Sequence, residues 1–225
     1  MVQNANDYTK QSNDIAIDTY YKELVQSRIS NGSDGTDGTN TTARNLKRFV
    51  ENTISNGGYY IARFEASYRD GIRPYSKVSV TATETATQTS GKLWNWINQQ
   101  NAAKASIAMY QDVSFETDLL NSYAWSTAIS YIQKCSGDSD YSMQSSLNTT
   151  IGNTGKNGDE RCKIQDMASN EREWCTETSS YVDSAHAAPC VSVGRDYTSP
   201  QGDTRYGSRA TSSNKHISFR MILYF

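Results

Sequence analysis

The stretch HISFRMILY, residues 216–224, lies at the C-terminal end of the sequence. Its apolar residues alternate, so Ile217, Phe219, Met221 and Leu223 fall on one face of an extended chain. This alternation predicts a strand with one buried side. Upstream of it, from residue 162 onward, the sequence has almost no helical periodicity, so the predicted helices all lie earlier in the chain.

Three helices are predicted between residues 44 and 134. Residues 44–55 (RNLKRFVENTIS) carry apolar side chains at helical spacing, and Asn56-Gly57-Gly58 ends that helix. A second helix is predicted over residues 98–110. A third is predicted over residues 122–134, with Ser122 as its N-cap and an apolar stripe that consists of Trp125, Ala128, Ile129 and Ile132.

The remaining segments are expected to be strand or loop. Residues 59–66 (YYIARFEA) predict a strand, and residues 15–29 a short additional helix. Residues 76–90 are expected to be a loop or weak strand, and residues 136–163 a loop. About 25 residues from 191 to 215 are also expected to be loop, and loops that long in a compact domain usually carry function.

The composition excludes several classes of function. The sequence has 22 Lys and Arg residues against 24 Asp and Glu residues. This near-neutral balance does not indicate a basic surface for binding nucleic acid or anionic lipid. No apolar run is long enough for a membrane span, and residues 1–10 lack the apolar core of a signal peptide. Ser, Thr and Asn make up 68 of 225 residues and Tyr 15. This composition is typical both of loop-rich folds and of contact surfaces such as antibody loops.

Five segments, taken in order, resemble a known family. They are GGYYIARFEAS (57–67), LWNWINQQNAAKASIAMY (93–110), LNSYAWSTAISYI (120–132), KIQDMASNEREWCTE (163–177) and ISFRMILY (217–224). Together they resemble the formylglycine-generating-enzyme-like (sulfatase-modifying factor) domain, and within it the phage and bacterial branch that includes variable proteins of diversity-generating retroelements. The resemblance implies an α+β molecule with a C-type lectin fold that has two or three helices, short antiparallel sheets and long irregular loops. It covers residues 44–225 and leaves residues 1–43 as an N-terminal segment with a Gly/Asp/Thr-rich loop.

The sequence departs from the family at three places. Ser169 replaces the usual glycine, Glu171-Arg172 replaces an apolar pair, and Val193-Gly194-Arg195 stands where the family has Arg-Gly-Gly. Asp166 and Trp174 are retained, so the core around them is expected to survive. Arg220 is expected to make a structural polar contact, and Gly194, Gly202 and Gly207 are expected to form turns.

An oxidase of this family needs a pair of cysteines that binds copper after the Arg-Gly-Gly segment, and thiolates suit Cu(I). The corresponding residues 197–206 contain no cysteine. The four cysteines form no C-x-x-C pair. The sequence is compatible both with a Cys175–Cys190 disulfide and with free thiols. His186 and Cys190 could bind a metal only with further ligands, and the sequence does not specify these. We therefore predict no catalytic residue, no metal site and no cofactor.

The resemblance gives residues 191–216 a specific meaning, because in the diversified members this stretch carries the varied ligand contacts. Arg and Tyr are common at interface hot spots. The resemblance therefore implies a non-catalytic protein on a phage tail or bacterial surface that binds a protein or cell-surface ligand, as a homo-oligomer or as part of a tail assembly. The implied contact residues are Arg195, Asp196, Tyr197, Thr198, Gln201, Asp203, Arg205, Tyr206, Lys215 and His216.

Two alternatives remain beside this hypothesis. One is a copper-dependent oxidase of the formylglycine-generating type, which requires two thiols within bridging reach. The other is a fixed structural module of a phage particle, whose 191–216 surface is covered by neighbouring subunits. The binding hypothesis expects the Arg and Tyr side chains of residues 191–216 to point outward in one exposed patch.

Overall fold

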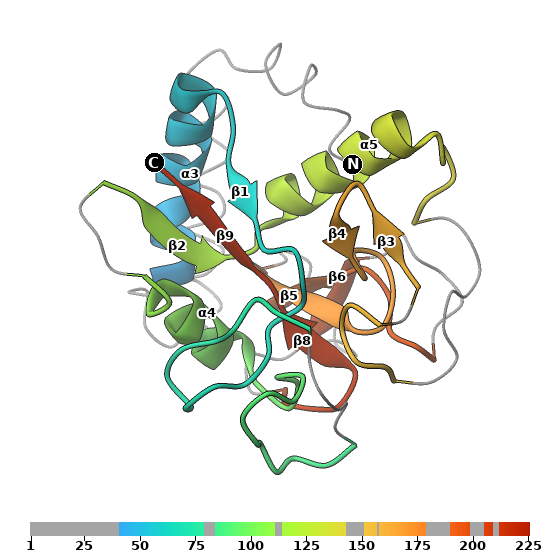
Figure 1. Cartoon of the computed structure of the whole chain (residues 1–225). Coiled ribbons are helices and arrows are strands. Elements are labelled where there is room, and N and C mark those ends of the chain that lie inside the picture. Colours follow the sequence, from blue (N-terminus) through green and yellow to red (C-terminus); the bar gives the residue numbers. More distant parts are fainter. Residues whose placement is uncertain are drawn as a thin grey trace.

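The computed structural model describes residues 41–78, 84–110, 114–142, 151–156, 158–178, 190–198, 205–208 and 212–225. Within these residues the protein is an α+β molecule with three helices and short sheets (Figure 1). The predicted helix over residues 15–29 lies outside the described residues. None of the helices described is long and apolar enough to cross a membrane.

Helix α3 (Thr41–Asn56) contains the predicted helix over residues 44–55 and begins three residues earlier. It ends at Gly57, whose φ of +76° suits glycine, as the Asn-Gly-Gly sequence predicts. Its side chains Phe49 and Val50 are buried. Phe49 makes an edge-to-face contact with Tyr224, with ring centroids 5.4 Å apart, so α3 packs beside the C-terminal strand (Figure 1).

Helix α4 (Gln99–Ile107) confirms the second predicted helix. Asn98 is its N-cap, and its side-chain oxygen accepts a hydrogen bond of 2.9 Å from the backbone N–H of Asn101. Ala102 and Ala105 are buried, and these small side chains allow the helix to lie close to the strands beneath it.

Helix α5 (Ser122–Ser136) confirms the third predicted helix and its apolar stripe, since Trp125, Ala128, Ile129 and Ile132 are all buried. The predicted N-cap is wrong. Asn121 caps the helix by accepting a hydrogen bond of 2.9 Å from the backbone N–H of Ala124, and Ser122 is the first helical residue. An Asn side chain at N-cap is as effective as Ser, which is why the two neighbouring residues compete for the role.

The first sheet has three antiparallel strands in the order β1 (Tyr60–Ile61), β9 (Met221–Tyr224) and β2 (Glu116–Leu119). The predicted strand over residues 59–66 is therefore much shorter than expected. After β1 the chain keeps only single backbone hydrogen bonds to the C-terminal segment, from Ala62 N–H to the Met221 carbonyl at 2.9 Å and from Ala66 N–H to the Phe219 carbonyl at 2.8 Å. Regular pairing is lost there because Glu65 turns into the interior, where it is fully buried.

The second sheet has four strands in the order β7 (Arg205–Ser208), β6 (Cys190–Val193), β5 (Arg172–Thr178) and β8 (Ile217–Phe219). Strands β5 and β8 are parallel, and the other pairs are antiparallel. The expectation of continuous loop over residues 191–215 is therefore wrong, because β6 and β7 pair within it. Gly207 lies inside β7 rather than in a turn, whereas Gly194 has the expected positive φ of +79°.

A two-stranded hairpin, β3 (Glu160–Arg161) with β4 (Ile164–Gln165), interrupts the loop predicted over residues 136–163. It leads directly into the segment that contains Asp166 and Trp174. Both residues are completely buried, and the Trp174 indole N–H donates to the Ile97 carbonyl at 2.8 Å. The predicted core around this segment is confirmed.

The C-terminal stretch is not the single one-sided strand that the alternation predicts. It is split at Arg220 into β8, which belongs to the four-stranded sheet, and β9, which is the centre of the three-stranded sheet. Both faces are buried, since Ser218 and Ile222 are as inaccessible as Phe219, whereas Leu223 is only partly buried. The split arises because Arg220 turns inward to polar partners that the alternation does not reveal.

Candidate functional site

Arg220 joins the two sheets through buried polar contacts and confirms the expected structural role. Its guanidinium donates to Glu173 at 2.8 Å, to the Ala62 carbonyl at 2.8 Å and to the Gln165 carbonyl at 2.8 Å. Burial alone would lower the pKa of Arg220, but the carboxylates of Glu173 and Glu65 raise it above its usual value. Four chain segments therefore meet at one cation that stays charged.

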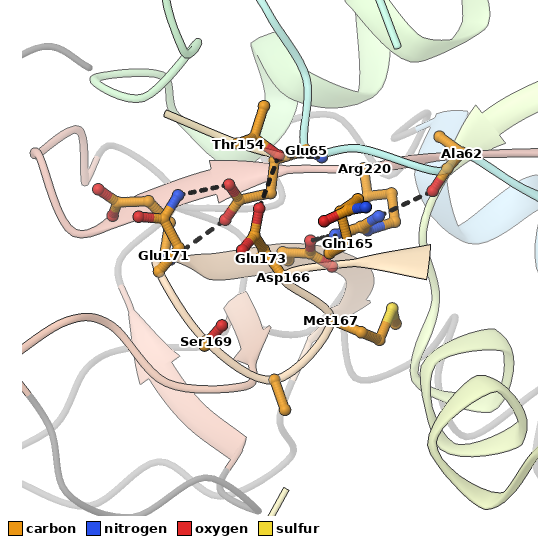
Figure 2. Close-up of polar contacts among 12 residues, drawn as sticks. Ala62, Glu65, Thr154, Gln165, Asp166, Met167, Ser169, Glu171, Glu173 and Arg220 are labelled. Carbon is orange, nitrogen blue, oxygen red and sulfur yellow. Dashed lines mark hydrogen bonds and ion pairs between the residues drawn. The ribbon is translucent and has the colours of Figure 1, made fainter. Parts of the chain in front are cut away.

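Three carboxyl groups lie near this cation, and Glu173 is in direct contact with it (Figure 2). Glu65, Asp166 and Glu173 are each almost completely buried. Burial raises the pKa of Glu65 well above its usual value, and the nearby carboxyl groups of Asp166 and Glu173 raise it further. One arginine thus lies near three buried acids, and burial together with two of these acids holds the pKa of Glu65 above its usual range.

Asn170, the last residue of the Asp-Met-Ala-Ser-Asn sequence, connects Glu65 to the upstream loop at Gly152. Its side-chain amide donates to Glu65 at 2.6 Å and accepts from the Gly152 N–H at 2.8 Å. Asn170 has a φ of +67°, a left-handed conformation that Asn tolerates better than most residues. The backbone N–H of Glu171 donates to the other Glu65 oxygen at 3.1 Å, so both carboxyl oxygens of Glu65 have donors.

Glu171 links the buried cluster to the molecular surface. Burial raises the pKa of its carboxyl group well above the usual value, and the carboxyl groups of Glu65 and Asp196 add to this shift. Asp196 is also buried and lies closer to solvent, where Arg172 forms an ion pair with it at 3.0 Å. Glu171 is therefore an electrostatic neighbour both of Glu65, in the buried cluster, and of Asp196, which pairs with Arg172.

Asp196 organises the loop that follows β6. It accepts a hydrogen bond of 2.8 Å from the backbone N–H of Thr198 and a second, very short one from the Thr198 hydroxyl. The imidazole of His216 lies 3.7 Å from it. Burial lowers the pKa of His216, which opposes the attraction of Asp196. Asp196 therefore acts as a fixed anchor beneath more exposed side chains.

Tyr197 stacks on His216, with ring centroids 5.2 Å apart and an angle of 23° between the rings. Its backbone N–H donates to the Asn170 carbonyl at 2.9 Å, so the loop is tied to the segment above the acidic cluster. The Lys215 ammonium lies 5.9 Å from the centre of the Tyr197 ring and forms an ion pair of 2.8 Å with Glu84.

Tyr206 extends this surface along β7, where it is paired with Ser192 of β6. The Arg172 guanidinium lies over its ring, 4.7 Å from the ring centre. These contacts bring together five partly exposed side chains from four separate segments. We name them the aromatic face: Arg172, Tyr197, Tyr206, Lys215 and His216.

The structure separates the predicted contact residues into three groups. Tyr197, Thr198, Tyr206, Lys215 and His216 are at least partly exposed and lie together around Asp196. Arg195 and Asp196 are 2% and 4% exposed, so the expectation that Arg195 points outward is wrong. Asp159 and Tyr141 are electrostatic neighbours of Arg195, which places its charge toward the interior. Gln201 and Asp203, together with the side chain of Arg205 in β7, lie outside the described residues.

Two residues of this region were not predicted from the sequence. Arg172 directly precedes Glu173 and Trp174, and in the sequence it is distinguished only as a departure from an apolar pair. Glu84 lies in a Thr-rich stretch with no pattern of its own and meets Lys215 across 131 residues of sequence. Only the three-dimensional arrangement brings both to the aromatic face.

The cysteines give no support to a Cys175–Cys190 disulfide, because Cys175 is a thiol in the structure, as are Cys135 and Cys162. Cys175 is completely buried in β5, whereas Cys135 is exposed near the end of α5. In the part of the chain that is described, no group of three or more His, Cys, Asp or Glu side chains is arranged to hold a metal ion. His186 and the side chain of Cys190 lie outside that part.

Comparisons with known proteins add no neighbour to this picture. No protein-family model matches the chain, and neither a curated protein nor a solved structure matches it.

Proposed function

We propose that this protein is a non-catalytic binding protein that presents the aromatic face, and the loops next to it, to a protein or cell-surface ligand. In this proposal the chain is a member of the formylglycine-generating-enzyme-like family with a C-type lectin fold. It resembles the variable proteins of diversity-generating retroelements and is displayed on a phage tail or a bacterial surface. The five ordered sequence segments that resemble the family support this assignment.

One observation carries the proposal: partly exposed Tyr, His, Lys and Arg side chains gather on loops whose backbones are attached to a buried polar scaffold. The Arg172 N–H donates to the His216 carbonyl at 3.0 Å, and the Trp96 N–H donates to the Asn214 carbonyl at 3.0 Å. Fixed loops that carry aromatic and cationic side chains are the arrangement that binding loops on rigid scaffolds use.

The chemistry of the aromatic face suits recognition of a macromolecule. Tyr197 and Tyr206 offer flat apolar area with a hydroxyl group at low cost in side-chain entropy. Arg172 offers planar donors for carboxylate or carbonyl groups. Its ion pair with Asp196 holds the guanidinium in place before a ligand arrives, which lowers the ordering cost of binding.

The DNA that encodes the chain provides the direct test. We expect a reverse-transcriptase gene within a few kilobases, together with a near-copy of the segment that encodes residues 191–225. Mismatches confined to adenines of that copy, and to codons such as those of Tyr197 and Tyr206, would support a diversified binder. If the copy is absent, the proposal that this face is diversified is wrong.

A protein-level test uses tolerance to substitution. Tyr197→Ala and Lys215→Ala should each change the free energy of unfolding by less than about 1 kcal/mol, because a diversified face must accept other side chains. The matched control Asp196→Ala removes a buried anchor and should cost clearly more. Equal, large losses for all three variants would show that the face is part of the structural core and contradict the proposal.

A further inference from the structure

A pocket with a volume of about 280 Å³ lies between the loop of residues 69–77 and the segment that directly follows α4. Three cationic side chains and two tyrosine rings line it. We name the following residues the basic pocket: Arg69, Arg73, Tyr75, Lys77, Met109 and Tyr110. The aromatic face contributes no residue to the basic pocket, so the pocket is a separate feature.

The backbone of the loop brings the three cations together around one ring. Ser67 and Tyr75 form an antiparallel bridge with backbone hydrogen bonds of 2.9 and 2.8 Å. This register places Arg69 opposite Arg73 across the turn. The Arg69 guanidinium lies 5.0 Å from the centre of the Tyr75 ring, and the Lys77 ammonium lies 4.3 Å from it. The ring therefore holds two of the cations in place.

Both walls of the basic pocket are fixed by hydrogen bonds. The Asp70 side chain accepts hydrogen bonds from the backbone N–H groups of Ile72 and Arg73, at 2.9 and 2.8 Å, and this closes the turn of the loop. In the opposite wall, the Tyr110 N–H donates to the Thr117 hydroxyl of β2 at 3.2 Å. Walls that are ordered in advance lower the ordering cost of binding a ligand.

The cations of the basic pocket are only partly neutralised. Arg69 and Arg73 share the carboxylate of Asp70, at 3.8 and 3.6 Å, and all three side chains are exposed, so these ion pairs are weak. Lys77 forms no ion pair with a described residue. Three cations thus face one adjacent carboxylate, in a chain whose net charge is −2. The local excess of positive charge fits an anion that carries two charges.

We propose that the basic pocket binds a phosphate monoester attached to a flat ring. A phosphate monoester carries a charge of about −1.5 to −2 near pH 7, which matches the excess of the pocket. The planar guanidinium groups suit its oxygens, and Lys77 adds a point charge. The ring of the ligand lies against Met109 and Tyr110. This inference does not depend on the proposed binding function.

Isothermal titration calorimetry on the full chain at pH 8 and low salt tests this assignment, with phenyl phosphate as the probe. We expect saturable binding of one molecule per chain, which weakens as salt is added. Phenyl sulfate has the same ring and one charge fewer, so it should bind about fivefold more weakly or worse. Inorganic phosphate lacks the ring and should also bind more weakly than phenyl phosphate.

Substitutions in the loop should move the affinity in both directions. Arg73→Gln and Lys77→Gln should each weaken binding of phenyl phosphate by about fivefold or more. Asp70→Asn keeps a side-chain oxygen for the turn and removes the competing carboxylate, so it should tighten binding. The matched control is Arg63→Gln. Arg63 is half-exposed and lies over the Phe64 ring at 5.2 Å, but it is outside the pocket, so the control should leave the affinity unchanged.

Several results would overturn the proposal. One is the absence of saturable binding of phenyl phosphate to the native chain. Equal affinity for phenyl phosphate and phenyl sulfate would show that the second charge is not recognised, and equal affinity for inorganic phosphate would show that the ring is not. A loss in Arg63→Gln as large as that in Lys77→Gln would reduce the effect to overall charge. An unchanged midpoint of thermal unfolding shows that each variant is folded, and the gain expected for Asp70→Asn does not depend on the loss in the other variants.

Discussion

The sharpest test of the fold is removal of the buried Arg220 charge by Arg220→Met. The guanidinium is completely buried and lies 2.7 Å from Glu173. Breaking a buried ion pair by removing one partner costs about 3–5 kcal/mol, because the other charge remains buried without compensation. The carbonyl oxygens of Ala62 and Gln165 also lose their donor, which adds about 1 kcal/mol or more for each.

We therefore expect Arg220→Met to lower the free energy of unfolding by at least about 3 kcal/mol at pH 7. Urea unfolding of the full chain measures this change through tryptophan fluorescence, because Trp125 and Trp174 are buried near the two sheets. The double variant Arg220→Met/Glu173→Gln removes the uncompensated carboxylate. It should be more stable than Arg220→Met alone, by about 1 kcal/mol or more.

The pH dependence supplies an independent signature. Burial already raises the pKa of Glu173, and Arg220 opposes this shift. Without Arg220 the native state must hold Glu173 protonated. The stability of Arg220→Met is then highest below the usual carboxyl pKa, and it is lost as the pH rises through the raised pKa of Glu173 in the native state. Arg220→Met should therefore be more stable at pH 5 than at pH 8, and the double variant should show a flatter profile.

Two results would refute this reasoning. A loss below about 1 kcal/mol for Arg220→Met would show that the ion pair does not join the sheets. Strict additivity of the two substitutions, with no recovery in the double variant, would show that Glu173 does not depend on Arg220. If Arg220→Met does not fold at pH 7, the measurement at pH 5 still distinguishes these outcomes.

Three further predictions concern other parts of the fold. Glu171→Gln should stabilise the protein at pH 8 and lose this advantage below pH 5, because burial and the carboxyl groups of Glu65 and Asp196 raise the pKa of Glu171. Thermal unfolding at both pH values measures this difference. An equal effect at the two pH values would contradict the prediction. Gly155→Ala should lower the free energy of unfolding more than the matched Gly158→Ala. Both positions have a positive φ, which costs a residue with a Cβ about 1–2 kcal/mol, but only at Gly155 would the new Cβ lie 2.5 Å from the Phe64 ring. Equal losses of stability in urea unfolding would argue against this contact. Asn121→Ala should cost about 1 kcal/mol and Ser122→Ala less, as measured by the helical circular dichroism during thermal unfolding; the opposite order would restore Ser122 as the N-cap.

The helices were predictable because their signals are local. The apolar stripe of α5 and the Asn-Gly-Gly end of α3 lie within a few residues of the structure they specify. The N-cap of α5 was misplaced by one residue because Asn121 and Ser122 are both good caps. Such errors of one position follow from the similar chemistry of neighbouring side chains.

The strands were less predictable because their partners are remote. The division of the C-terminal stretch depends on Arg220 and Glu173, which are 47 residues apart in sequence. Strand β7 has the sequence Arg-Tyr-Gly-Ser, which is too short and too polar for an alternation to be recognised. Pairing with β6 compensates for this weak intrinsic preference.

The candidate site was predicted in part. Its exposed members Tyr197, Lys215 and His216 come from the family resemblance, and the structure places them together. The same list contained Asp196, which is buried as an anchor. A sequence pattern does not distinguish a polar loop residue that faces a ligand from one that holds the loop, since both require the same chemical groups.

The placement of β8 and β9 has a consequence for synthesis of the protein. Strand β9 occupies the middle of one sheet, and β8 completes the edge of the other. While the chain is still on the ribosome, neither sheet can close until these residues have emerged. A premature stop codon or frameshift within the codons for residues 191–216 would therefore leave a product with two unfinished sheets. Changes in the codons upstream of β8 and β9 can therefore yield a folded protein only when they keep the reading frame.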